Sequence, residues 1–419
     1  MSRPVWEMAD VIARFGDQLR QSGHVGAWQK KTLTDLGQCR TALLGGHVDA
    51  CTGCGQFRVS YNSCRNRNCP KCQSLEREAW ILCILGREAD LLPVVYYHVV
   101  FTMPSELNGL CLRNPRFMYD TLFDSAWATL QKFAADPKWL GAQTGATMVL
   151  HTWGQNLSLH PHAHCIVPGG GLDAEGRWQK SRAGGDQFLY PVKAIWRVYR
   201  AIFMKKLCVA LESGALVLPE SEPEFYDPQA YRAWKNARYS KPWVVYAKRP
   251  FGGPKQVIEY LGRYTHKTAI SNHRLLEVTD TAVRFSYKDY RAEGKRKEMM
   301  LEGVEFLRRF TLHFPPKGFR RMRHYGILSN TQKGKALAAC RQSLSPDEVP
   351  VLKKTRQELR AAALAKFLDG RPPNWCACCK APTMVRIGVV PPQSLPFMSG
   401  ARAPPGPMPP WQPTADWKN

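Results

Sequence analysis

The sequence has no apolar run of about 18 or more residues, so it offers no candidate membrane-spanning segment. The N-terminus, MSRPVWEMADVIARFGDQLRQ, is an amphipathic pattern containing acids and matches neither a signal peptide nor a transit peptide. Acidic residues are scarce, because 34 Asp and Glu stand against 59 Lys and Arg and leave a net charge of +25. This excess favours a polyanionic partner, most simply nucleic acid. We therefore expect a cytoplasmic protein without a membrane partner.

The sequence also lacks internal repeats, and its 419 residues allow two or three domains. Seven cysteines between positions 39 and 83 indicate a small module in residues 1–90. Residues 91–330 form the expected main domain, 331–384 a basic helical region with a CxxC pair, and 385–419 a Pro-rich disordered tail.

Apolar patterning predicts an α+β main domain with separated strands and intervening helices. The expected helices are residues 115–135, 191–213 and a short one at 256–264. The expected strands are residues 91–103, 145–152, 162–167 and 281–288.

The 14 cysteines of a cytoplasmic protein indicate metal binding before disulfides. The stretch CTGCGQFRVSYNSCRNRNCPKCQ contains two CxxC pairs, fourteen residues apart. Four thiolates complete a tetrahedral zinc site, so we expect one structural zinc ion here. The four predicted ligands are Cys51, Cys54, Cys69 and Cys72.

Three further residues nearby, Cys39, His47 and Cys64, suggest a second zinc site that is one ligand short. The basic residues Arg58, Arg65, Arg67 and Lys71 lie among the ligands, so the module is expected to contact DNA. A separate CxxC, Cys376 and Cys379, either pairs with distant ligands or has no metal role.

Histidines are few, 11 in all, yet three occupy alternate positions in LSLHPHAHCIVPGGG. Alternation places His160, His162 and His164 on one face of a strand. His162 and His164 are the predicted ligands of a divalent cation, with Gln155 as a candidate third ligand through its side-chain oxygen. Two imidazoles and an oxygen suit Mg²⁺ or Mn²⁺ with an open position, and such a cation polarises a phosphoryl oxygen. The role of His160 stays open.

The stretch QVIEYLGRYTHK contains a candidate nucleophile pair. Tyr260 and Tyr264 are four residues apart, so they share one face of a helix. A phenolate that attacks a scissile phosphate forms a phosphotyrosine bond and preserves the phosphodiester energy for rejoining. Downstream, residues 287–325 contain eleven Lys or Arg against five acids, with aromatic residues between them. Cations bind phosphates and aromatic rings stack on unpaired bases, so this stretch is a candidate nucleic-acid contact.

These motifs together resemble the IS91 family of HUH-type, two-tyrosine, rolling-circle transposases. The resemblance covers most of residues 30–330 and rests on YNSCRNRNCPKCQ, TWGQNLSLHPHAHCIVPGGG, VYAKRPFGGPKQVIEYLGRYTHKTAISNHRL and PPKGFRRMRHYGILS. It implies an N-terminal zinc-binding domain and an HUH nuclease domain whose central antiparallel sheet carries the histidine pair. It also implies that His162 and His164 bind the metal and that Tyr260 and Tyr264 are catalytic.

The implied activity is cleavage and joining of single-stranded DNA at element ends, with strand transfer into target DNA in the nucleoid. No GxxxxGK[ST] motif occurs, so any unwinding is expected from a host helicase. Asn68 departs from the histidine common in similar sequences, which removes one ligand for a second zinc site.

Three other functions fit parts of the pattern. A replication initiator or relaxase uses the same chemistry at a plasmid or phage origin. A non-catalytic zinc-finger protein would bind nucleic acid without needing the tyrosine hydroxyls, and a metal hydrolase using water would form no covalent adduct.

Overall fold

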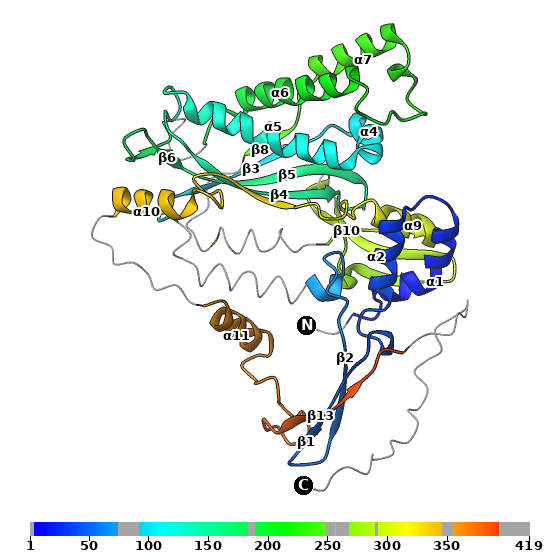
Figure 1. Ribbon diagram of the computed structural model, residues 1–419. Helices are drawn as coiled ribbons and strands as arrows, with labels where there is room; N and C mark the ends of the chain where they lie inside the picture. The colour runs from blue at the N-terminus through cyan, green and yellow to red at the C-terminus, as the bar shows by residue number, and fades with distance from the viewer. Residues whose placement is uncertain are drawn as a thin grey trace.

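The structure is a computed structural model that describes residues 4–73, 92–182, 189–247, 256, 268–289, 292–345 and 355–393. Its largest sheet is antiparallel and has five strands in the order β12-β4-β5-β3-β8 (Figure 1). The strands are β3 (Tyr96–Thr102), β4 (Gly145–Trp153), β5 (Leu159–Pro168), β8 (Val245–Ala247) and β12 (Met322–Gly326).

The five-stranded sheet has one apolar face, and helices cover it (Figure 1). Alternate residues of the central strands, such as Met148, Leu150, Ala163 and Cys165, are fully buried there against the helices. These helices are α4 (Asn108–Arg113), α5 (Pro115–Ala135), α6 (Val192–Glu212) and α7 (Pro228–Ser240). The intervening residues of β4 and β5 project to the other face, which carries the histidines.

The expected elements of the main domain agree with this sheet and its helices. The helices predicted at 115–135 and 191–213 correspond to α5 and α6, and three predicted strands correspond to β3, β4 and β5. The strand predicted at 281–288 is β10 (Ala282–Asp289). The helix predicted at 256–264 lies outside the described residues except for residue 256. The mixed architecture with a central antiparallel sheet confirms the α+β class.

A second hydrophobic core contains residues from the expected N-terminal module and from the later part of the expected main domain. The helices α1 (Met8–Gln21) and α2 (Ala27–Gly37) pack with α9 (Gly303–Thr311) and with a three-stranded sheet. That sheet consists of β9 (Leu275–Val278), β10 and β11 (Lys295–Glu302). The Phe15 ring lies directly against Gly303, where a side chain would overlap it. The N-terminal helices therefore share their core with residues 269–314.

A third small sheet has the order β13-β1-β2 and combines both ends of the chain (Figure 1). It consists of β1 (Gly46–Cys51), β2 (Phe57–Tyr61) and β13 (Met384–Val390). This corrects the expectation of a disordered tail from residue 385. The stretch MVRIGVV is rich in β-branched residues and free of proline, and the prolines begin only at Pro391.

The remaining elements are short or peripheral. The hairpin β6 (Gly170–Leu172) and β7 (Trp178–Lys180) contacts α10 (Lys333–Leu344), and α11 (Arg356–Phe367) precedes the C-terminal CxxC. In the described part of the chain, 3-10 turns span Ala42–Leu44, Ser105–Leu107, Pro223–Phe225 and Asn272–Arg274. Among the described residues, no helix combines the length and apolarity needed to cross a membrane.

Candidate active site and metal clusters

Three histidines from the two central strands meet on the polar face of the five-stranded sheet. His151 of β4 is the cross-strand neighbour of His162 on β5, and His164 lies two positions further along β5. One ring nitrogen of each lies within 4.8 Å of the others. The structure therefore brings His162 and His164 together with a third imidazole from the neighbouring strand, and their role as metal ligands stays a prediction.

Hydrogen bonds orient two of these imidazoles. The Nδ1–H of His162 donates to the backbone oxygen of His160 at 2.6 Å, which makes Nε2 the nitrogen that can bind a cation. His164 Nδ1 lies 2.8 Å from Nε2 of His98, a buried residue of β3 whose ring stacks on that of His164. This contact likewise turns His164 Nε2 toward the cluster. Such outer contacts fix the tautomer and the ring orientation of a metal ligand.

A buried histidine of the neighbouring core holds the β4–β5 hairpin in place. His313, just after α9, donates from Nε2 to the Leu157 carbonyl oxygen at 3.1 Å, and its Nδ1 accepts from the Thr152 hydroxyl at 3.3 Å. Burial lowers the pKa of His313 from 6.5 to about 4, so the ring is neutral at pH 7. Leu157 has a positive φ of 63°, and this bond stabilises the tight turn.

The same hairpin is bound by Arg274, the last residue of the 3-10 turn before β9. Its guanidinium donates to the backbone oxygens of Gln155 and Ser286. Burial lowers the pKa of Arg274 to about 10, with nearby Arg296 as a second cause. Gln155 itself follows β4 in the turn to β5, and the contact observed there is made by its backbone. Its assignment as an oxygen ligand stays a prediction.

The two predicted nucleophiles, Tyr260 and Tyr264, lie outside the described residues. The structure therefore leaves their distance from the histidine cluster undetermined, and their role stays a prediction. Sequence reasoning missed His151 and His98, although both occur in segments that were expected to be strands. Alternation along 145–152 would have placed His151 on the polar face, opposite His162.

Four cysteines form a cluster beside the core that contains α1 and α2. Cys39, Cys64, Cys69 and Cys72 place their sulfur atoms within 4.8 Å of one another. The sulfur of Cys72 lies 3.6 Å from that of Cys39 and 3.7 Å from that of Cys64. Hydrogen bonds, chiefly from Cys64, lower the pKa of Cys39 to about 7, and contact with Cys39 lowers the pKa of Cys72, whereas contact with Cys39 raises the pKa of Cys64 and of Cys69. This donor set fits structural zinc.

The predicted division of the ligands was therefore wrong. Cys51 and Cys54 do not share a cluster with Cys69 and Cys72. The strand β2 lies between the two pairs in the sequence and carries the chain away from the outer end of the β1–β2 hairpin. A five-residue strand spans roughly 17 Å, far more than one zinc site. The second predicted ligand set, Cys39, His47 and Cys64, is divided as well, because only Cys39 and Cys64 belong to the first cluster.

Neither cysteine cluster in the described residues includes His47. Its Nε2 lies 3.7 Å from the Asp49 carboxylate, on β1. Cys51 and Cys54 meet the other CxxC pair, Cys376 and Cys379, with all four sulfur atoms within 4.8 Å.

Most of the basic residues of the cysteine module bind other parts of the chain. Arg58 pairs with Asp49 at 3.0 Å, and Lys71 pairs with Glu7. Arg67 donates from its guanidinium to the Phe319 carbonyl oxygen at 2.6 Å, in the loop before β12. The first two contacts lie within the module, whereas the Arg67 contact docks the module onto the main domain. Of the four cations expected to face DNA, Arg58 and Arg65 are exposed, with Arg58 paired to Asp49, and the DNA contact of this module stays a prediction.

Internal partners also neutralise part of the basic stretch 287–325. Arg308 and Arg309 both pair with Glu305, and Lys297 pairs with Asp289. Lys295 and Arg296, which begin β11, are exposed. They lie where the chain passes from β10 into β11, with Lys295 opposite Asp289, and their exposure makes them the better candidates for phosphate contacts.

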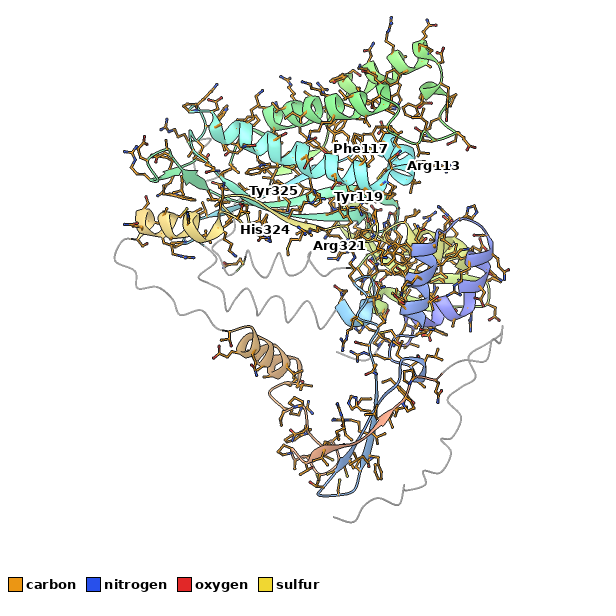
Figure 2. All side chains as sticks on the ribbon, in the orientation of Figure 1. Arg113, Phe117, Tyr119, Arg321, His324 and Tyr325 are labelled. Atoms are coloured by element: carbon orange, nitrogen blue, oxygen red, sulfur yellow. The ribbon has the colours of Figure 1, made fainter. Side chains whose placement is uncertain are left out.

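The edge strand β12 extends both faces of the five-stranded sheet. Figure 2 shows Tyr325 on the α5 side of β12 and His324 on the opposite side. Tyr325 stacks on Trp127 of α5, with ring centroids 5.2 Å apart. His324 Nδ1 lies 2.9 Å from the Thr147 hydroxyl of β4, which shares the histidine face. The polar face that contains the cluster therefore continues to the edge of the sheet.

Comparisons with known proteins agree with this arrangement. A family model described as "Putative transposase" matches residues 145–335, and one described as "Transposase zinc-binding domain" matches residues 11–103. "Putative transposase y4qJ" of Sinorhizobium fredii (strain NBRC 101917 / NGR234) is 41% identical over 391 residues, 93% of this chain and 96% of the relative. The transposase for insertion sequence element IS801 of Pseudomonas savastanoi pv. phaseolicola is 28% identical over 369 residues, 87% and 84% of the two chains. No solved structure matches.

The two family models thus identify a transposase with a zinc-binding domain, and the cysteine clusters fit zinc binding. More particularly, the chain belongs to the IS91 family of transposases. Such enzymes cleave DNA and transfer its strands, so DNA is the substrate.

Proposed function

We propose that the chain nicks and rejoins single-stranded DNA at the ends of its element, through 5′-phosphotyrosine intermediates in rolling-circle transposition. The observation that carries this proposal is the cluster of His151, His162 and His164 on the central strands of a transposase. The rival assignment as a replication initiator or relaxase uses the same chemistry, and the transposase relatives along nearly the whole chain favour transposition.

The cluster fits a divalent cation with an open coordination position. Three imidazoles are nitrogen donors, whereas Mg²⁺ strongly prefers oxygen, so this set favours Mn²⁺ over Mg²⁺ unless Gln155 adds an oxygen. When bound, the cation would polarise a non-bridging oxygen of the scissile phosphate. His98 and the His160 carbonyl oxygen hold the rings of His164 and His162 in the orientation that binding needs.

The nucleophile in this proposal is the phenolate of Tyr260 or Tyr264. Its oxygen attacks phosphorus and forms a phosphotyrosine bond, and the bond from phosphorus to the 3′ oxygen breaks. The phenol proton is lost, and the departing 3′ oxygen takes up a proton to become a free hydroxyl. Rejoining reverses the step, because a 3′ hydroxyl attacks the phosphotyrosine and the tyrosine leaves. No water is consumed, and two tyrosines permit two such bonds in one site.

The single strand is proposed to run along the histidine face, with Lys295 and Arg296 as phosphate contacts. Both side chains are exposed at one end of the β10–β11 hairpin. Two other cations of this hairpin, Arg284 and Lys297, are paired with acids. Each phosphate contact releases counterions, so binding should weaken steeply with added salt.

Denaturing gel electrophoresis with labelled single-stranded DNA from the element's ends tests this function. We expect an SDS-resistant protein–DNA band that needs Mn²⁺ or Mg²⁺ and is removed by EDTA. It should disappear in the Tyr260→Phe, Tyr264→Phe double variant and in His151→Ala. The matched control is His160→Ala, because the cluster excludes that side chain and the backbone oxygen that His160 contributes remains.

Every other outcome of this experiment would indicate a different function or a different set of catalytic residues. Cut DNA without an adduct would indicate a hydrolase that uses water. An adduct that survives in the double variant would refute the tyrosine assignment, and an unaffected His151→Ala variant would refute the third imidazole. DNA binding without any cutting of the true end sequence would indicate a non-catalytic protein.

A further inference from the structure

Two CxxC pairs from opposite ends of the chain meet at the outer end of the β1–β2 hairpin, where Figure 1 shows β13 beside β1. Cys51 ends β1 and Cys54 lies in the hairpin turn, whereas Cys376 and Cys379 precede β13. We propose that these four thiolates bind a second structural zinc ion, which fastens the C-terminal segment 355–393 onto the N-terminal module. This site lies partly outside the matched zinc-binding domain and does not depend on the proposed nuclease activity.

The distances between the sulfur atoms match a tetrahedral ion. Zinc–sulfur bonds of about 2.3 Å place the four sulfurs of a tetrahedron about 3.8 Å apart. The sulfur atoms of Cys51 and Cys379 are 3.5 Å apart, and those of Cys54 and Cys376 are 3.6 Å apart. Each of these two contacts joins one hairpin cysteine to one C-terminal cysteine, as a shared ion requires.

The hairpin turn is folded around the sulfur of Cys51. The backbone N–H groups of Gly53 and Cys54 point to this sulfur at 3.3 and 3.4 Å. The Thr383 hydroxyl, from the C-terminal segment, lies 2.9 Å from the same atom. Gly55 closes the turn with a positive φ of 71°. Donors that converge on one sulfur stabilise its thiolate form, and thiolate is the form that binds metal.

The C-terminal pair also lies in a turn. The Cys376 N–H donates to the Ala381 carbonyl oxygen at 2.8 Å, and Lys380 adopts a positive φ of 52° within that turn. The Thr383 hydroxyl also lies 3.4 Å from the sulfur of Cys379. The two turns therefore face each other with their cysteines inward, and one threonine contacts a sulfur from each.

The apolar area buried at this junction is too small to hold the two segments together by itself. The buried apolar residues there are Cys51, Cys376 and Met384, a cluster separate from the larger cores of the described chain. Three such side chains bury little area, and small modules of this size usually need a metal or disulfides. A metal-bound set of four thiolates supplies the missing stabilisation.

The two cysteine clusters differ in what they connect. In the first, Cys39 and Cys72 are 33 residues apart, so the ion stabilises a local fold. In the second, Cys51 and Cys379 are 328 residues apart, so the ion joins the two ends of the chain. Its loss should free β13 from β1 and leave the first cluster intact.

The first test is the zinc content of the wild-type chain after EDTA dialysis, counted by mercurial release of thiolate-bound zinc with a chromogenic zinc indicator. Two tetrathiolate clusters predict two zinc ions per chain. Zinc X-ray absorption of the same sample should show only sulfur neighbours, at about 2.3 Å. One zinc per chain, or nitrogen neighbours in a quarter of the ligand positions of one site, would overturn the assignment, and neither result depends on a variant folding.

Variants then locate the second ion. Cys51→Ser on the hairpin and Cys379→Ser on the C-terminal segment should each reduce the zinc content from two to one. Cys378→Ser is the matched control, because Cys378 lies inside the CxxC, is exposed and is outside the cluster. Cys54→His replaces a thiolate ligand with an imidazole ligand, so this variant should keep two zinc ions.

Limited proteolysis gives a second readout. The segment 355–393 should become cleavable in Cys379→Ser and stay protected in Cys378→Ser. Two zinc ions retained in both Cys51→Ser and Cys379→Ser would refute the proposal.

Discussion

Replacing His313 with glutamine should remove much of the acid sensitivity of the core that holds the β4–β5 hairpin. The ring is 3% exposed, and its burial lowers the pKa from 6.5 to about 4. An unfolded chain therefore takes up a proton near pH 6.5 that the folded chain accepts only near pH 4. The contribution of His313 is complete above pH 6.5 and is lost as the pH falls toward 4.

The size of this effect follows from the two pKa values. Between pH 7 and pH 5, protonation of the unfolded state alone lowers the free energy of unfolding by about 2 kcal/mol. For a folding unit of 150–250 residues, 1 kcal/mol corresponds to a change of roughly 2–4 °C in Tm. His313 should thus account for about 4–8 °C of the wild-type decrease in Tm over this range.

Thermal unfolding at pH 7 and pH 5 measures this difference. Glutamine is suitable because its amide can still donate to the Leu157 carbonyl oxygen, which accepts from His313 at 3.1 Å. The decrease in Tm should be smaller in His313→Gln than in wild type, whatever the absolute stability of the variant. His273→Gln, at an exposed position, should keep the wild-type decrease. Equal decreases in wild type and His313→Gln would refute the reasoning.

Three further predictions concern a glycine, an arginine and a cysteine. Gly326→Ala should cost more than about 1 kcal/mol, measured as a lower Tm, because φ is +57° and the new Cβ would overlap a backbone carbonyl; Gly318→Ala, with positive φ but open space, should cost less. Arg67→Ala should leave the Phe319 carbonyl oxygen without its guanidinium donor and remove one of two donors to the Pro316 carbonyl oxygen, costing about 1–3 kcal/mol and speeding amide exchange in the loop before β12. Cys72→Ser should release one zinc ion, whereas Cys111→Ser, a buried cysteine outside both clusters, should release none.

Periodicity predicted the elements of the main domain well because its strands and helices are long and buried. The helix at 115–135 begins at Pro115, a residue favoured in the first turn, and its apolar residues recur at helical spacing. Alternation likewise placed His162 and His164 on one strand face. The same rule applied to the neighbouring strand would have found His151.

The spacing of the cysteines in the sequence could not predict which of them share a metal ion. The intervals within each CxxC indicate a metal, but they do not say which pairs share an ion. That depends on the direction in which β2 carries the chain and on a strand from residues 384–390, more than 300 positions from β1. Long-range pairings of this kind leave no local signal, and for the same reason the core shared by α1, α2 and residues 269–314 was not foreseen.

The central position of β1 in the β13-β1-β2 sheet also constrains synthesis of the chain. The hairpin of β1 and β2 leaves the ribosome early, yet the third strand exists only once residue 390 has emerged. At roughly 5–20 residues per second, β1 waits on the order of 15–70 s with one edge unpaired. During that interval the edge is open to pairing with other nascent chains. Completion of this sheet is therefore a late event, and only chains translated nearly to the end can achieve it.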